Sequence, residues 1–353
     1  MRVPLVESVR SVFWARKRRP QHPSYWIALA HERFGPDRLV RQAVEAERAG
    51  FDGICASDHL APWWEPSPDA PAACGNVWVW LGAVGQATTK AAIGSAVTGI
   101  VHRYNPVVVA QQIATLETMF PGRAFLGVGS GEAMNEVPAG MEWPGTAEQL
   151  QRTEEALTII TRLLDGQTVD FRGDFFRARK ARLYLKPARR PPVYLSAFHE
   201  QAAEVAGHLA DGVWTLGDPT KAPQVIAGYR RGCEQAGRRA GEIVVQTVAS
   251  WAPDDDAALE AAKIWKGTQV DAAYTDALVA PAEIRRRGEE EVSDGALERN
   301  FIVSSDPDTH VKKIKLVQAL GATKLVVMNV AADPEGMIRA YGEHVLPALR
   351  SED

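Results

Sequence analysis

Residues 51–59 read Phe51-Asp52-Gly53-Ile54-Cys55-Ala56-Ser57-Asp58-His59, an apolar run that ends in three polar side chains. The short apolar part predicts a buried strand. The sequence that follows is rich in tryptophan and proline (residues 60–68), which is incompatible with a helix or an interior strand. The stretch therefore predicts a strand that presents His59 at its carboxyl end, where barrels of alternating strands and helices carry their active sites.

Seven further strand patterns alternate with helical patterns along the rest of the chain. The eight predicted strands are residues 25–30, 51–56, 91–97, 124–129, 193–195, 212–214, 243–248 and 324–328. The predicted helices between them include residues 37–50, with Asp37 as the N-cap, and residues 77–87, 107–120, 146–164, 200–209, 222–236 and 334–349. This alternation predicts an α/β fold, a (β/α)8 TIM barrel that forms one domain over residues 23–353. We expect residues 1–22 to be an N-terminal extension.

Two segments interrupt this alternation. Residues 167–185 alternate between apolar and polar side chains around Gly173, which predicts an inserted hairpin with strands at 169–176 and 181–185. Residues 267–297 are polar and charged, and they are too long for a simple connection. We interpret this second insertion as a lid or substrate segment.

Composition restricts the class of partner. Forty Lys and Arg against 44 Asp and Glu give a net charge of −4, too small and too mixed to recruit nucleic acid. No apolar run approaches the roughly 18 residues of a membrane span, so we expect no membrane partner. The three cysteines have no metal or disulfide spacing, which favours the reducing cytoplasm.

Two residues are candidates for acid-base chemistry. His59 carries an imidazole, a common general acid or base, although a strand-end histidine also serves as a plain hydrogen-bonding group. Glu132 ends the run Gly127-Val128-Gly129-Ser130-Gly131-Glu132, which follows the fourth strand and is a poor match to a dinucleotide fingerprint. We interpret its glycines as allowing a flat ligand to approach the backbone, with Glu132 at the same barrel end as His59 or, alternatively, on the surface.

Hydrolytic and metal chemistry have less support. The chain has no phosphate-binding loop, no Gly-x-Ser-x-Gly and no His-Glu-x-x-His. His31, Glu32, His59 and Glu132 follow successive strands, as ligands do in metal-dependent barrel hydrolases. We nevertheless expect no metal.

Four motifs carry a resemblance to a known family. They are Ser57-Asp58-His59-Leu60-Ala61-Pro62-Trp63, Arg103-Tyr104-Asn105-Pro106, Pro121-Gly122-Arg123, and Gly127-Val128-Gly129-Ser130-Gly131-Glu132-Ala133-Met134-Asn135-Glu136. Together they resemble the luciferase-like barrel family and, within it, the group that uses the deazaflavin coenzyme F420. The chain is similar to the F420-dependent alcohol dehydrogenases and glucose-6-phosphate dehydrogenases from about Trp26 to its C-terminus.

The resemblance implies roles for particular residues. His59 would be the base for the alcohol proton, Glu132 would exchange a proton with the deazaflavin, Trp63 would brace the reacting centre and Glu32 would line the pocket. A non-prolyl cis peptide is implied near Ala96-Val97. The cofactor-binding residues would be Asp58, Ala96, Val97, Thr98, Asn135, Ser196, Ala197, Phe198 and His199.

The stretch from Ser196 to His199 departs from the glycine-rich pattern of the family, although helix-start amides still favour an anion there. In the sugar-phosphate enzymes, cations hold the phosphate, whereas this chain has Pro219, Asp276 and Asn300 at or near those positions, with Lys221 and Arg299 close by. The resemblance therefore implies an alcohol or ketone substrate and a homodimer. The alternatives are a sugar-6-phosphate dehydrogenase, a flavin mononucleotide (FMN) monooxygenase or a barrel without enzymatic activity.

Overall fold

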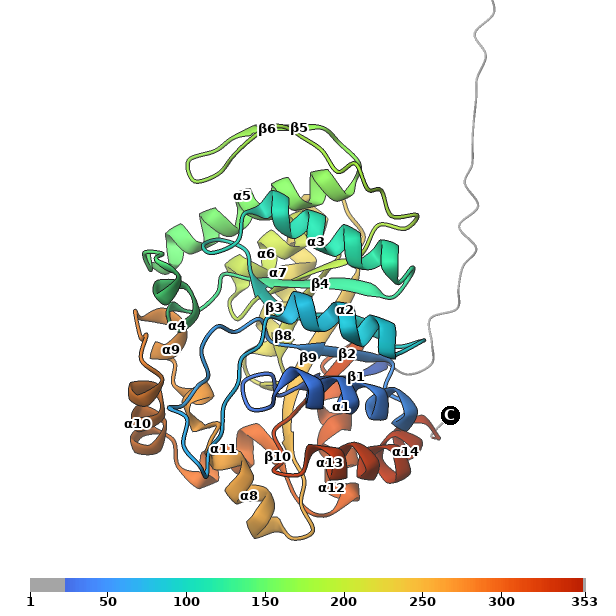
Figure 1. Ribbon diagram of the computed structural model, residues 1–353, viewed down its shortest axis with the longest axis vertical. Coiled ribbons are helices and arrows are strands. Elements are labelled where there is room, and N and C mark those ends of the chain that lie inside the picture. The colour runs from blue at the N-terminus through green and yellow to red at the C-terminus, as the bar shows by residue number, and fades with distance from the viewer. Residues whose placement is uncertain (1–22, 352–353) are drawn as a thin grey trace, which may run out of the picture.

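A computed structural model describes residues 23–351 of the chain as a closed barrel of parallel strands (Figure 1). Strand β9 pairs with β11 on one side and β8 on the other, which closes the sheet. In order around the barrel, the strands are β1 (Ser24–Leu29), β2 (Gly53–Ala56), β3 (Ala92–Gly99), β4 (Ala124–Gly129), β7 (Val193–Ser196), β8 (Gly212–Leu216), β9 (Glu242–Ser250) and β11 (Lys324–Asn329). The predicted (β/α)8 barrel is confirmed, whereas the expected extension at residues 1–22 lies outside the described residues.

The helices surround the barrel. They include α1 (Pro36–Ala49), α2 (Val77–Ala87), α3 (Pro106–Met119), α5 (Thr146–Leu164), α6 (Glu200–Leu209), α7 (Ala222–Gln235), α8 (Asp255–Lys263), α12 (Pro307–Gln318), α13 (Pro334–Ala340) and α14 (Leu346–Arg350). The prediction that Asp37 caps α1 was wrong, because Gly35 is the N-cap and Asp37 lies in the first turn. Pro36 explains the shift, since a proline is well suited to the first helical position.

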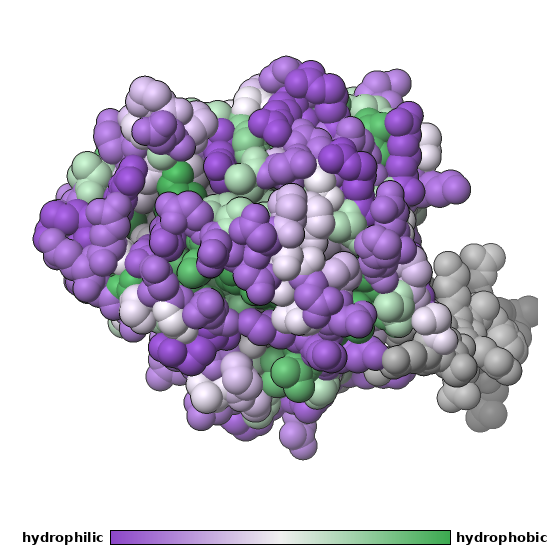
Figure 2. All heavy atoms as spheres, turned by 90° about the horizontal axis from the view of Figure 1, so that it is seen from below, coloured by the Kyte–Doolittle hydropathy of each residue, from purple (hydrophilic) through white to green (hydrophobic). Residues whose placement is uncertain are grey.

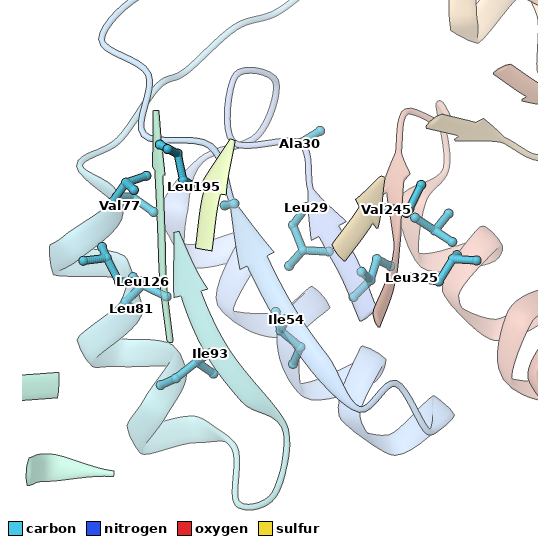
Figure 3. Close-up of a cluster of buried hydrophobic side chains, with 14 of the residues drawn as sticks. Leu29, Ala30, Ile54, Val77, Leu81, Ile93, Leu126, Leu195, Val245 and Leu325 are labelled. Atoms are coloured by element: carbon cyan, nitrogen blue, oxygen red, sulfur yellow. The ribbon is translucent and has the colours of Figure 1, made fainter. Parts of the chain in front are cut away.

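Two hydrophobic cores share the same strands, because successive side chains of a strand point to opposite faces. Trp26 and Ala28 of β1 point into the barrel and pack there with Phe125 and Trp214. The intervening strand side chains point outward and pack against the helices. Figure 3 shows part of this outer core, in which Ile93 and Leu126 belong to the same cluster as Val77 and Leu81 of α2.

The inserted hairpin has strands β5 (Val169–Arg172) and β6 (Arg177–Ala181) and arches over α5 (Figure 1). Its second strand begins four residues before the predicted start at residue 181. The turn explains the difference, since the Glu155 carboxylate accepts hydrogen bonds from the backbone amides of Asp174, Phe175 and Phe176. This anchor determines where the chain reverses.

The segment expected to be a lid is largely helical. It contains the short 3-10 helix η2 (Lys266–Gln269) and helices α9 (Ala272–Thr275), α10 (Pro281–Glu291) and α11 (Asp294–Asn300). An additional strand, β10 (Phe301–Val303), pairs with the end of β9 where β8 no longer accompanies it. Three residues are too few for a periodic pattern, which is why the sequence did not predict β10.

The surface of the described residues is mainly polar. Figure 2 shows one face, on which hydrophobic residues are scattered among hydrophilic ones. Within residues 23–351, no helix combines the length and the apolar character that crossing a membrane requires.

Candidate active site

Three strand ends place His59 between two carboxylates. Glu32 follows β1, His59 follows β2 and Glu132 follows β4. His59 Nδ1 lies 3.6 Å from Glu32 Oε1, and Nε2 lies 3.9 Å from Glu132 Oε2. Both distances exceed those of hydrogen bonds. The side chain of Glu32 is 1% exposed and that of His59 8%, whereas Glu132 is 21% exposed, so the Glu132 side is the more open one.

The neighbours of Glu32 hold it in the barrel end. Ser57 Oγ donates a hydrogen bond of 2.6 Å to Glu32 Oε1. His31 Nδ1 lies 3.0 Å from the Ser57 carbonyl oxygen, and burial lowers the pKa of His31, so its neutral ring donates there from Nδ1. Glu32 Oε2 and His31 Nε2 are buried without a hydrogen-bond partner.

Asn135 joins the loop that carries His59 to Glu132. Its Oδ1 accepts hydrogen bonds from the amides of Leu60 at 2.8 Å and Ala61 at 3.1 Å, and its Nδ2 donates to Glu132 Oε2 at 3.0 Å. The side chain is buried, and these three bonds define which atom is oxygen and which is nitrogen. Asn135 thereby fixes Glu132 relative to the loop that carries His59. The spacing of these residues in the sequence did not reveal this link.

Arg103 makes a second link between the same two loops. Its Nη2 donates to the backbone oxygen of Asp58 and lies 3.5 Å from Asp58 Oδ1, while its Nε donates to Glu136 Oε1 at 3.1 Å. Tyr104 also donates to Asp58 Oδ1, at 3.2 Å. Burial raises the pKa of Glu136 and the positive charge of Arg103 opposes this, whereas burial and Asp58 raise the pKa of Tyr104 to about 12. Arg103 thus compensates two buried carboxylates.

An aromatic row extends from His59 across the barrel end. The ring centroids of His59 and Trp63 lie 5.3 Å apart, those of Trp63 and Tyr274 5.6 Å, and those of Tyr274 and Phe198 5.8 Å. Tyr274 belongs to α9, which lies at the same end of the molecule as α4 (Ala133–Glu136) in Figure 1. Tyr274 was not among the predicted site residues, because nothing in the sequence around it indicates contact with Trp63.

The glycines within β4 are needed for a different reason from the expected approach of a flat ligand. A cis peptide joins Ala96 and Val97, where the pairing of β3 with β4 shifts register. A Cβ atom at Gly127 would lie 2.3 Å from the Ser95 carbonyl oxygen, and one at Gly129 would lie 2.9 Å from Val97 Cγ2. These glycines therefore make room for the irregular part of β3, and the structure assigns their space to protein atoms rather than to a ligand.

Among the residues predicted to bind the cofactor before α6, some backbone amides are hydrogen-bonded within the protein and others have no acceptor. The amide of Ala197 donates to the Trp214 carbonyl oxygen at 2.9 Å, so it is committed to the sheet. Helix α6 begins after His199 with no side-chain cap, which leaves first-turn amides without an intrahelical acceptor. Phe198, His199 and Lys221 line a hollow at this helix start.

Several buried polar atoms at this barrel end lack partners. They include His31 Nε2, Glu32 Oε2, Asp58 Oδ2, His59 Nδ1 and Thr98 Oγ1, together with Arg33 Nε and Nη1 next to Glu32. Leaving one such group unpaired costs about 1–3 kcal/mol, so their concentration is typical of a binding site. Among residues 23–351, no group of three or more His, Cys, Asp and Glu side chains is arranged to hold a metal ion.

The parallel barrel thus carries a histidine between two carboxylates at its carboxyl end, an arrangement of groups that can exchange protons. A model of the luciferase-like monooxygenase family matches residues 12–324, and the chain belongs to this family. It is 39% identical over 324 residues to an F420-dependent glucose-6-phosphate dehydrogenase of Microbacterium testaceum (strain StLB037), covering 90% of this chain and 95% of that protein. A protein with the same description from Nakamurella multipartita is 38% identical over 327 residues, covering 91% and 94%.

A solved structure is also similar. It is an F420-dependent secondary alcohol dehydrogenase in complex with an F420-acetone adduct, 31% identical to this chain. The superposition has a TM-score of 0.88 and covers 93% of this chain and 99% of that chain. These relatives share both the fold and a substantial part of the sequence.

Because Arg103 neutralises two buried carboxylates, its replacement should destabilise the protein to an extent that depends on pH. We expect Arg103→Gln to lower the free energy of unfolding by about 3 kcal/mol at neutral pH, because it leaves buried carboxylates without a cation. The folded-state pKa of Glu136, already above its ordinary value of 4.5, would rise further, so the folded state would retain a proton that the unfolded state releases. The deficit should therefore grow as the pH rises from about 4.5 to 7, as measured by urea unfolding.

Arg152→Gln is the matched control. Arg152 pairs with Glu148 one helical turn away, and both side chains are more exposed than those of Arg103 and Glu136. A change below about 1 kcal/mol is expected for it. Equal effects of the two substitutions, or a deficit for Arg103→Gln that does not vary with pH, would contradict this account.

Proposed function

We propose that the protein is an F420-dependent oxidoreductase that acts on an alcohol or the corresponding ketone. The observation that carries this proposal is the placement of His59 between Glu32 and Glu132 at the carboxyl end of the barrel. The relatives described above, which use coenzyme F420, support the choice of cofactor. When bound, the deazaflavin supplies a carbon that accepts or returns a hydride, while the protein provides orientation and proton transfer.

His59 acts as the base that takes the hydroxyl proton of the alcohol. Its Nδ1 faces buried Glu32, which favours a proton on that nitrogen and leaves the Nε2 lone pair free. Nε2 lies on the more open side, toward Glu132, and can accept a proton there. In the reverse direction, the protonated Nε2 returns the proton to the ketone oxygen.

Glu132 provides a second proton-transfer group that is separate from His59. It stands at the N-cap position of α4 without a side-chain capping bond, and Asn135 holds its Oε2 through a hydrogen bond of 3.0 Å. Its carboxylate exchanges a proton on the cofactor side while His59 serves the substrate side. Trp63 excludes water next to His59, since its side chain is 4% exposed and its ring lies in contact with the imidazole.

The buried polar atoms without partners, and the free amides at the start of α6, fit a cofactor with a polar ring system and a phosphate-bearing tail. Asp58 Oδ2 and Thr98 Oγ1 are buried without partners and would bind polar atoms of the cofactor. The backbone of Ala96 and Val97 forms the adjacent irregular part of β3. The uncapped start of α6, after Ser196-Ala197-Phe198-His199, would bind the phosphate through its backbone amides, because helix N-termini favour anions. Asn135 would contribute chiefly by holding Glu132.

The charges favour an uncharged substrate over a sugar phosphate. Among the described residues, Arg103 is the cation in ion-pair contact with this acidic site, and Asp58 and Glu136 already occupy it. Asn300, near a position where sugar-phosphate enzymes carry a cation, donates to Gln269 Oε1 at 2.9 Å. A phosphate dianion beside Arg103 would therefore meet a cation that two carboxylates already neutralise. Sugar-6-phosphate oxidation remains the second candidate because the relatives from M. testaceum and N. multipartita bear that name.

Replacement of His59 tests the proposed chemistry. We expect His59→Ala to lower kcat for a secondary alcohol by about 100-fold or more, the usual contribution of a general base, while F420 affinity changes little. The reaction is followed by the loss of the visible absorption of oxidised F420, and affinity by fluorescence titration.

His208→Ala is the control, because His208 lies at the far end of α6 and pairs with Gln235 at the surface. It should retain the full kcat. The proposal fails if the wild-type protein binds F420 but reduces it with no alcohol, or if His59→Ala is as active as the wild type.

We also propose that the protein forms a homodimer through α2 and α3. Helix α2 contains no charged residue, yet Val79 on it is 76% exposed. On the adjacent α3, Val108 is 45% and Met119 is 55% exposed. A helix that is apolar on all sides is usually buried, which supports coverage of this surface by a second copy.

Sedimentation measurements test the dimer. We expect twice the chain mass at micromolar concentration, and we expect Val79→Glu to yield monomers because it places a charge in the apolar interface. Leu316→Glu is the matched control, since Leu316 on α12 is 71% exposed outside α2 and α3. A wild-type monomer, or dissociation by both substitutions alike, would contradict the proposed interface.

A further inference from the structure

In the aromatic row Trp63–Tyr274–Phe198, only Trp63 has a role in the acid-base chemistry described above, and Tyr274 and Phe198 have none. Its members come from three distant parts of the chain: the loop after β2, helix α9 and the segment after β7. Consecutive rings lie 5.6 and 5.8 Å apart, within aromatic contact distance. The row begins at Trp63, whose centroid is 5.3 Å from that of His59, so it extends from the proposed base outward.

A hydrogen bond and close packing fix the part of the row formed by Trp63 and Tyr274. The Tyr274 hydroxyl donates to the Thr268 carbonyl oxygen at 3.0 Å, so its polar atom is satisfied within its own segment. Trp64, next to Trp63, is fully buried and packs against Trp265 with centroids 4.9 Å apart. A Cβ atom at Gly267 would lie 3.2 Å from the Trp63 carbonyl oxygen, which shows how closely the two segments approach.

Tyr274 also lies within electrostatic reach of the acid-base site. Burial raises its pKa, and the negative charges of Glu132 and Glu32 add to this effect. The phenol therefore stays neutral and bound to Thr268. At the outer end, Phe198 is 37% exposed, so the row passes from a buried ring beside His59 to a ring that reaches solvent.

We propose that Trp63, Tyr274 and Phe198 form the wall of a substrate subsite that binds an uncharged apolar substituent of the alcohol or ketone carbon, with Tyr274 as its central, specificity-determining residue. This inference rests on the proposed function and adds the substrate class to it. The faces of aromatic rings bind alkyl or aryl groups by excluding water. The unpaired carboxylate oxygens at the same barrel end disfavour a phosphate or carboxylate on the substrate.

A series of 2-alkanols from 2-propanol to 2-hexanol tests the wall. In the wild type, kcat/KM should rise about two- to fourfold for each added methylene, the ratio expected when a methylene is partly or fully removed from water. Tyr274→Ala should abolish most of this rise and leave kcat/KM for 2-propanol within about threefold of the wild type, because the smallest substrate does not reach Tyr274. Tyr274→Phe should retain the rise, since the ring is kept.

Two further variants complete the set. Phe198→Ala should reduce the rise for the longest alcohols, and its exposed position makes correct folding the expected result even if Tyr274→Ala unfolds. Tyr184→Ala is the matched control, because Tyr184 is 81% exposed in the segment after the inserted hairpin and should leave the series unchanged. Thermal unfolding of each variant reports whether the fold is intact.

A calorimetric measurement separates this inference from the proposed function. Dissociation constants of 2-alkanones with increasing chain length, measured without turnover, should fall with each methylene in the wild type and in Tyr274→Phe, but not in Tyr274→Ala. Equal slopes in Tyr274→Ala and the wild type, no slope in the wild type, or a higher kcat/KM for glucose 6-phosphate than for 2-hexanol would each overturn the subsite. Failure of F420 reduction by every alcohol, together with a normal ketone slope, would instead refute the proposed function alone.

Discussion

The structure depends on how it compensates negative charge buried at one end of the barrel. Glu32, Asp58 and Glu136 are all buried there, and an ionised carboxylate is costly in such a place unless it is paired. Arg103 bridges Asp58 and Glu136, and Ser57 binds Glu32. Because these bonds connect the ends of different strands, the compensation of charge also aligns the loops that carry the site.

This alignment explains why His59 can lie between two carboxylates without hydrogen-bonding to either. The loop that carries His59 is held on one side by Arg103 through Asp58 and on the other by Asn135 through Leu60 and Ala61. Glu132 is bound to the same Asn135. The imidazole is therefore positioned by its backbone and its neighbours, which leaves its nitrogens available for proton transfer.

Much of the fold could be predicted from the sequence, because the signals are local. Apolar runs bounded by loops identified all eight barrel strands, and the abrupt end of one run located His59. The cross-links of the site could not be predicted in this way. Asn135 contacts residues about 75 positions earlier, and Tyr274 contacts Trp63 across more than half the chain, so neither contact leaves a periodic pattern. The role of Gly127 was also mispredicted. It makes room for the Ser95 carbonyl oxygen and not for a ligand, and Ser95 belongs to another strand.

Cofactor binding tests the central claim most directly. Purified protein is titrated with oxidised coenzyme F420 and, separately, with flavin mononucleotide, while the fluorescence of the ligand and of the tryptophans is followed. The account predicts saturable binding of F420, none of flavin mononucleotide at the same concentrations, and retained F420 binding in His59→Ala. Preference for flavin mononucleotide would contradict it in favour of monooxygenase chemistry, and binding of neither would contradict the assignment of this barrel end as a deazaflavin site.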